Sequence, residues 1–142
     1  MNESVSLVGK IQILLNDKEV LKKDNLIVQV GKNYLAGAVI NSATTPFVAM
    51  AIGTGTTAAT TADTTLQTEI ARGAFTTSSV TTNVVSLSNT FAAGTGTGAI
   101  TEAGIFSNSS TGGTMLSHVV FSAVNKAALD TLTINWTITV NC

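Results

Sequence analysis

The sequence has very little of what enzymes and metalloproteins use for chemistry. Its 142 residues include one histidine, His118, and one cysteine, Cys142. A single cysteine excludes an internal disulfide, and a zinc site needs several His or Cys ligands. The loops at 53–57 and 94–98 alternate glycine and threonine but lack the lysine of a phosphate-binding loop. We therefore expect no disulfide, no metal and no cofactor.

Charge is also scarce. Charged residues make up 11% of the chain, against about a quarter in typical domains, and the net charge is −1. No basic stripe is present, so we expect no nucleic-acid partner. No apolar run approaches the roughly 20 residues of a membrane span, and the first residues lack a basic cluster before an apolar core. We therefore expect neither a membrane segment nor a signal peptide.

Threonine is abundant instead. The chain has none before Thr44 and 24 from there to Thr139. Threonine is β-branched and suits a half-exposed pleated surface. In residues 131–140, five apolar side chains, including Trp136, alternate with four threonines and one asparagine. This period of two predicts a strand with one buried face, and core packing is the expected role of Trp136.

Weaker patterns of the same kind predict the rest of the fold. The residues Asn16 and Asp17 predict a hairpin turn, and the spacing of apolar residues predicts one short helix over 31–41. A turn or one helical turn is expected before Leu66, with Asp63 or Thr64 as its cap. Further strands are expected at about 5–15, 47–52, 70–76, 85–91, 100–106 and 115–121. We therefore predict an all-β fold, an antiparallel, jelly-roll-like β-sandwich with an N-terminal hairpin and one short helix.

The distribution of charge divides the chain near residue 43. Residues 1–33 hold nine of the fifteen charged side chains. We predict an N-terminal hairpin and helix arm over 1–43, a linker at 41–46, and a β-sandwich domain over 47–142. The edge of the hairpin would offer unpaired N–H and C=O groups, so the arm is the expected docking element.

Few residues in the second part could carry chemistry. Glu69, Arg72 and Glu102 stand among apolar neighbours, where opposite charges tend to pair. We predict a salt bridge from Arg72 to Glu102 or to Glu69, inside the fold or at an interface, rather than an acid–base pair of a glycosidase. His118 has no recognisable nucleophile motif near it, so we expect a structural or surface role. The protein is not expected to be an enzyme.

Four segments occur in an order that resembles a known group. They are the strand end Met50–Gly55, the segment Ala62–Arg72 with its Leu, Glu and Arg, the strand Ile100–Phe106, and the threonine-rich strand Asp130–Val140. This order resembles the amino-terminal, virion-attaching domains of tail-collar fibre proteins of tailed bacteriophages, over about residues 47–140. In that resemblance, Glu69, Arg72 and Glu102 match the charged positions of the family pattern.

The resemblance implies a non-enzymatic virion component that packs against copies of itself, in a trimer or ring, and against other virion proteins. Fibre proteins continue into a long shaft, whereas this sequence ends at Cys142, so a tail or fibre-base subunit or an adaptor is expected. Two alternatives remain. One is a capsid decoration (cement) protein on the phage head. The other is a carbohydrate-binding module with an exposed Trp136 or Tyr34 as its stacking platform.

Overall fold

The computed structural model describes residues 5–42 and 45–141. Within them, nine strands form one antiparallel sheet in the order β4-β3-β7-β8-β2-β1-β9-β6-β5. One short helix, α1, is present in the same residues, and no helix there is long and apolar enough to cross a membrane. The elements are β1 (Ser6–Leu15), β2 (Lys18–Ile27), α1 (Gln29–Ala38), β3 (Ala49–Gly53), β4 (Glu69–Ala74), β5 (Thr77–Thr81), β6 (Val84–Phe91), β7 (Gly98–Phe106), β8 (Met115–Lys126) and β9 (Leu132–Asn141).

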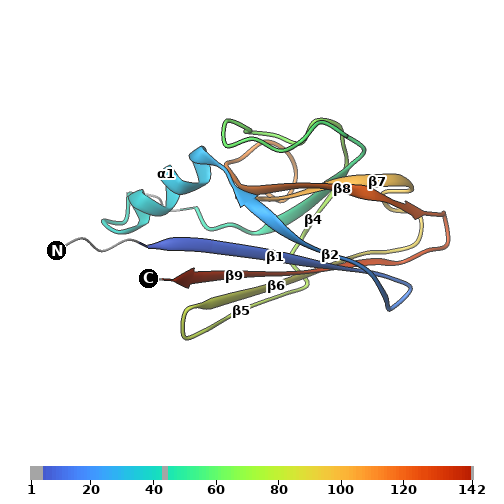
Figure 1. Cartoon of the computed structure of the whole chain (residues 1–142), viewed down its shortest axis with the longest axis horizontal. Coiled ribbons are helices and arrows are strands. Elements are labelled where there is room, and N and C mark those ends of the chain that lie inside the picture. Colours follow the sequence, from blue (N-terminus) through green and yellow to red (C-terminus); the bar gives the residue numbers. More distant parts are fainter. Residues whose placement is uncertain (1–4, 43–44, 142) are drawn as a thin grey trace.

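The sheet curls into two layers that β2 joins. Figure 1 shows β7 and β8 above, β1, β9, β6 and β5 below, and β2 passing from one level to the other. β2 pairs with β1 along most of its length but with β8 only at Leu26 and Ile27. The prediction of an all-β fold with a hairpin and one short helix is confirmed. The predicted sandwich is not confirmed, because the two layers belong to one continuous curled sheet.

The first hairpin turns at the predicted place. Asn16 and Asp17 have φ angles of 51° and 66°, the left-handed conformation that a two-residue hairpin turn needs and that Asn and Asp tolerate. The hairpin does not stand at the edge of the sheet, because β1 pairs with β9 from Ser6↔Asn141 to Leu15↔Leu132. The residues before position 43 thus supply two central strands. Of the linker expected at 41–46, residues 43 and 44 lie outside the described residues, as does Cys142.

The core lies between the two layers. On β9, Leu132, Ile134, Trp136 and Ile138 are buried, as their alternation predicts. They pack in one cluster with buried side chains of the upper layer, such as Ile52 and Ile105. The predicted buried strand at 47–52 is also confirmed, since all five residues of β3 are buried.

A partly buried amide links the two layers beside this core. With its oxygen turned toward the indole, Asn25 of β2 accepts hydrogen bonds from Trp136 Nε1 at 3.2 Å and from Ser117 Oγ at 3.0 Å, and its nitrogen donates to Gly9 O at 2.7 Å. A Cβ at Gly9 would overlap the Asn25 side chain, so only glycine leaves room for this network. The hydrogen bonds satisfy polar groups that would otherwise be costly to bury.

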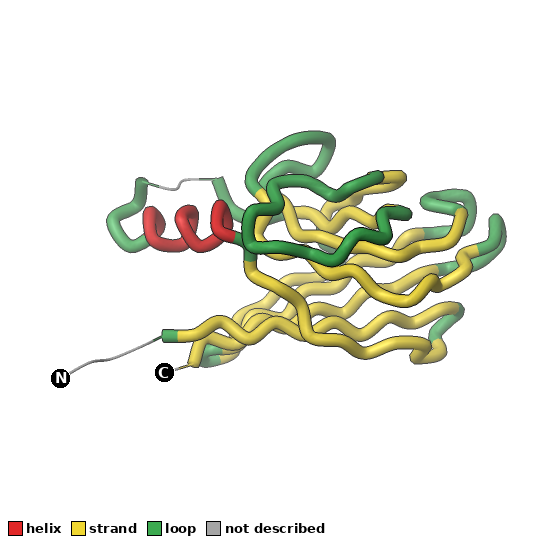
Figure 2. The backbone as a smooth tube through the Cα atoms, turned by 45° about the horizontal axis from the view of Figure 1, so that its top comes forward, coloured by secondary structure: helices red, strands yellow, loops and turns green. Residues whose placement is uncertain are grey.

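The helix α1 packs at one end of the sheet (Figure 2). It begins two residues earlier than the predicted helix and lies against β8. Gly31 allows that close contact, because a Cβ there would lie 2.6 Å from the Leu116 carbonyl oxygen. Of the turn or helical turn expected before Leu66, the structure has a turn, closed by the hydrogen bond from Asp63 N to Thr60 O at 3.1 Å. Residues 54–68 contain no helix, and the Asp63 side chain has another role, described below.

Candidate functional site

The outer face of the upper layer gathers several of the charged residues of the second part of the chain. The strand register places Arg72, Ala51, Gly104 and His118 in one row across β4, β3, β7 and β8. Glu102 lies two residues before Gly104 on β7 and therefore points to the same face. Three of the charged or titratable residues that the sequence singles out thus share one surface, and that surface faces away from the main core.

A long loop covers this surface, and we name residues 54–68 the strap. In Figure 1 it is the green loop above β7 and β8. Its Leu66 lies directly over Gly104, where an added Cβ would be 3.0 Å from Leu66 Cδ2. Leu66 forms a second apolar cluster, separate from the main core, whose other buried members are Val28, Ala51, Phe106 and Met115.

Glu102 holds both ends of the strap from below. Its carboxylate is fully buried and accepts backbone N–H groups of Gly55 at 2.8 Å, Gln67 at 2.9 Å and Thr68 at 2.8 Å. Burial alone would raise the pKa of Glu102, but hydrogen bonds from Gln67, Thr68, His118 and Gly55 outweigh it and hold the pKa below its ordinary value. A buried carboxylate thus serves as the anchor of an otherwise irregular loop.

His118 connects Glu102 to the middle of the strap. The side chain is fully buried, with Nε2 at 2.9 Å from Glu102 Oε1 and Nδ1 at 2.7 Å from Asp63 Oδ2. Asp63 also accepts the backbone N–H and the hydroxyl of Thr60. Burial raises the pKa of Asp63, while the hydrogen bonds from Thr60 and His118 lower it more, so that its pKa lies below the ordinary value. Both carboxylates are therefore ionised at neutral pH.

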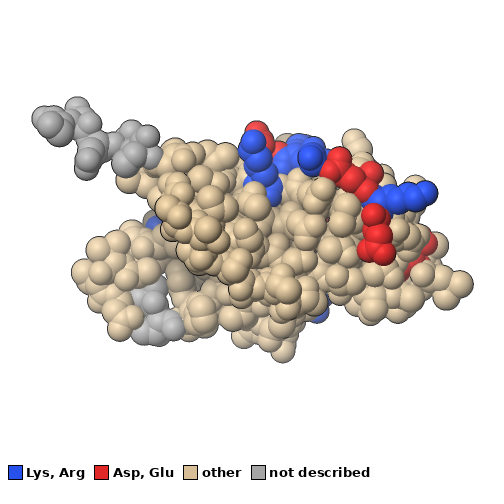
Figure 3. Space-filling model, turned by 90° about the horizontal axis from the view of Figure 1, so that it is seen from below, with Lys and Arg blue, Asp and Glu red and all other residues tan. Residues whose placement is uncertain are grey.

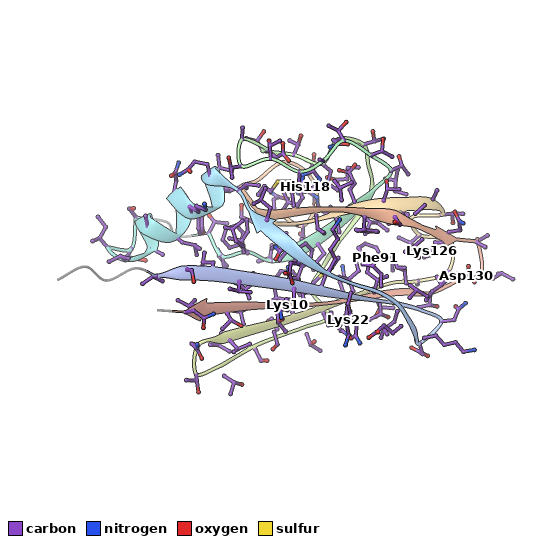
Figure 4. The ribbon with its side chains drawn as sticks, in the orientation of Figure 1. Lys10, Lys22, Phe91, His118, Lys126 and Asp130 are labelled. Carbon is purple, nitrogen blue, oxygen red and sulfur yellow. The ribbon has the colours of Figure 1, made fainter. Side chains whose placement is uncertain are left out.

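This chain of acid, histidine and acid differs from a catalytic triad. Both ring nitrogens of His118 face carboxylate oxygens, and both can donate hydrogen bonds only when the ring carries two protons. A triad needs one ring nitrogen free to take a proton from a nucleophile, and here neither is free. Within residues 5–42 and 45–141, no group of three His, Cys, Asp or Glu side chains is arranged to hold a metal ion. The geometry suits fastening a loop. Figure 4 places His118 in the upper layer, apart from Lys10 and Lys22 below.

Arg72 fastens a second loop at the same surface. Its guanidinium binds Glu69 through two contacts, Nε–Oε2 at 3.0 Å and Nη2–Oε1 at 2.7 Å. Nη1 donates to the carbonyl oxygens of Asn108 at 3.0 Å and Gly112 at 2.7 Å, and the group lies 3.9 Å from the centre of the Phe106 ring. Of the two partners that the sequence allowed, the structure has Glu69, and Glu102 pairs with His118 instead.

The structure also shows where His118 and Trp136, two residues considered in the sequence analysis, lie. Of the structural or surface position expected for His118, the structure shows a fully buried side chain. Its link to Asp63 was missed, because the two residues are 55 positions apart and only the path of the strap brings them together. The sequence did offer one signal: the only histidine lies within an apolar strand, and a buried histidine needs polar partners. Trp136 lies in the core between the layers and does not contribute to this surface.

Comparisons with known proteins identified no relative of this chain. No protein-family model, no curated protein and no solved structure matches the chain.

Proposed function

We propose that the protein is a non-enzymatic structural subunit of a bacteriophage virion, which packs against copies of itself and against other virion proteins. A tail or fibre-base subunit or an adaptor is the favoured place, on the order of motifs between residues 47 and 140. The physical observation that carries a packing role is an uncovered aliphatic groove at one end of the sheet.

The groove lies where α1 meets the ends of β1, β2 and β9. Its volume is about 900 Å³, and among the residues that the structure describes, Lys32 is the only charged one in its lining. Val39, just after the helix, is 83% exposed, and Val140 at the end of β9 is 42% exposed. The neighbouring Ile40 is 81% exposed. Aliphatic side chains gathered at one exposed place mark contact surfaces between proteins more often than scattered single ones do.

The charge distribution agrees with contacts between identical copies. The charged side chains visible in Figure 3 gather along one side of the face shown, and most of that face is uncharged. A net charge of −1 gives two copies little reason to repel each other. The groove and the protruding Val39 and Ile40 belong to one patch, so a two-fold or cyclic arrangement could place the protrusion of one copy in the groove of the next.

A charge placed in this patch tests the packing role. We expect Val39→Glu to weaken self-association at least about tenfold, because a carboxylate would be buried against aliphatic side chains without a partner. The Tm should stay within about 2 °C, since Val39 is exposed in the single chain. Light scattering coupled to size-exclusion chromatography over a range of concentrations, together with sedimentation velocity, measures the association.

Leu129→Glu is the matched control, because Leu129 is 88% exposed and lies in the loop before β9, outside the groove. It should leave association unchanged. A wild-type chain that stays monomeric at high concentration, or equal association of both variants, would count against the copy-to-copy contact. Imaging of intact particles carrying a labelled chain separates the tail from the head, where a decoration protein would lie.

The two aromatic residues expected to stack on a sugar in the carbohydrate-binding alternative are not exposed as that role requires. Trp136 is fully buried, and the Tyr34 ring packs at 4.7 Å, centre to centre, against Phe47. Within the described residues, every aromatic side chain is at least partly buried. A sugar ring needs an open aromatic face, so this geometry favours the packing role over glycan stacking.

A further inference from the structure

We propose that the strap, residues 54–68, is an acid-released cover: protonation of the two carboxylates that fasten it, Glu102 beneath it and Asp63 within it, opens the strap and exposes the apolar surface of the upper layer while the remaining sheet stays folded. The proposal concerns the opposite layer from the groove above and does not depend on self-association.

The strap is fastened at few points, and most of them are one connected network. Its two ends meet at Glu102, and its middle reaches the same carboxylate through Asp63 and His118. The remaining anchors are hydrogen bonds such as Thr54 N to Thr68 O at 3.0 Å and Gln29 N to Thr61 O at 2.8 Å, and the side chain of Leu66. A loop without a ladder of β-sheet hydrogen bonds depends on such anchors, and the free energy needed to open it is lower than that needed to open the strands.

Protonation acts directly on this network. Glu102 faces three backbone N–H donors and an imidazole nitrogen, and a neutral carboxyl group accepts such hydrogen bonds more weakly than a carboxylate does. Loss of either carboxylate charge also weakens its contact with the buried ring of His118. Both effects favour the open strap, in which the three side chains are hydrated.

The direction with pH follows from the two carboxyl groups. The folded pKa values of Asp63 and Glu102 lie below the ordinary ones, so their stabilisation is complete above the ordinary carboxyl range. It is lost as the pH falls through the folded values. The strap should therefore stay closed at neutral pH and open below about pH 4.

No other charge nearby replaces the lost contacts. Asp63 is the only charged residue of the strap itself. Glu69 and Arg72 on β4 are engaged with each other, and Lys23 of β2 donates to the Val120 carbonyl oxygen at 2.5 Å. Among the described residues, the charged and titratable groups nearest the strap are Glu102 of β7, His118 of β8, Glu69 and Arg72 of β4, and Lys23 and Asp24 of β2. The helix α1, whose Gln29 N–H donates to Thr61 O, carries Lys32 and Tyr34.

Release would uncover a defined apolar surface. Leu66 is 5% exposed, and Ala51, Phe106 and Met115 beneath or beside it are fully buried. They form a cluster apart from the main core, so removing the strap exposes them without opening the space between the layers. An apolar dye should report that change separately from unfolding.

Amide hydrogen exchange of the full chain tests the proposal. At about pH 3 we expect the backbone amides of Gly55, Gln67 and Thr68 to lose about a hundredfold in protection, relative to their intrinsic exchange rates, while the β1–β9 ladder keeps its protection. Dye fluorescence should rise over the same pH range. Loss of protection in the strap and in the β1–β9 ladder at one common pH would overturn the proposal, because the strap would then have no separate transition.

Variants separate the network from general acid sensitivity. Glu102→Gln should open the strap at about pH 7, and the milder Asp63→Asn, at a partly exposed residue, should lower strap protection about tenfold there. Asp130→Asn is the matched control. The pKa of Asp130 is also lowered, by Asn16 and the Ala127 amide, but it lies at the far end of the molecule from His118 (Figure 4). This variant should leave the strap closed at neutral pH. Unchanged strap protection in both Glu102→Gln and Asp63→Asn would overturn the proposal.

Discussion

Replacing Arg72 with alanine should lower the free energy of unfolding by about 2–3 kcal/mol, because hydrogen bonds to a charged group are stronger than neutral ones, although the partner Glu69 is partly exposed. The guanidinium is 5% exposed and is held by Glu69, by two backbone carbonyl oxygens and by the Phe106 ring. Without it, the carbonyls of Asn108 and Gly112 lose their donor, and the loop between β7 and β8 loses its link to β4. Urea denaturation followed by circular dichroism measures the change.

Two conservative variants show which part of the Arg72 contact matters. Arg72→Lys keeps the charge but loses the planar fork, so it should recover only part of the stability. Glu69→Gln should cost less than Arg72→Ala, about 1 kcal/mol, because the Glu69 side chain is 31% exposed and water can replace some of the contact. An Arg72→Ala protein with the stability of the wild type would show that the guanidinium is dispensable for this loop.

The second large effect is expected at Trp136. Trp136→Ala should destabilise the protein by about 3–5 kcal/mol, since the side chain is fully buried between the layers and a large cavity would remain. The loss also removes the hydrogen bond from the indole to Asn25, which in turn contacts Ser117 of the upper layer. Thermal and urea unfolding should both report the loss.

Trp136→Phe separates packing from hydrogen bonding. It keeps most of the apolar volume but leaves the Asn25 oxygen with one donor fewer, so a smaller loss of about 1–2 kcal/mol is expected. Equal losses for alanine and phenylalanine would indicate that the hydrogen-bond network, rather than the filled space, decides stability at this position.

Local patterns in the sequence predicted the regular parts of this fold. The alternation in β9, the turn at Asn16 and Asp17, and the short helix all depend on neighbouring residues, so they can be inferred without knowing the partner strands. The position of the first hairpin in the sheet could not be inferred in this way, because β1 pairs with β9, which lies at the other end of the sequence. Charge composition suggested an arm, whereas the apolar face of β1 completes the core.

The same reasoning could identify the charged residues of the candidate site but not their partners. Glu69, Arg72 and Glu102 stand out as rare charges among apolar neighbours, and burial of such charges requires partners. The partners of Glu102 are determined by the path that the strap takes over the sheet. That path depends on Glu102 accepting three backbone amides and on the missing side chain of Gly104, and neither leaves a periodic pattern in the sequence.

The pairing of β1 with β9 also determines how the molecule would respond to force. Ser6 lies opposite Asn141, so both described ends of the chain leave from the same pole. A load applied between these ends would part the two strands like a zipper, breaking one pair of hydrogen bonds at a time. A load applied between Ser6 and the turn at Asn16 would instead run along β1 and strain all of its pairs together. The direction of tension, more than its size, would then decide whether the sheet stays intact.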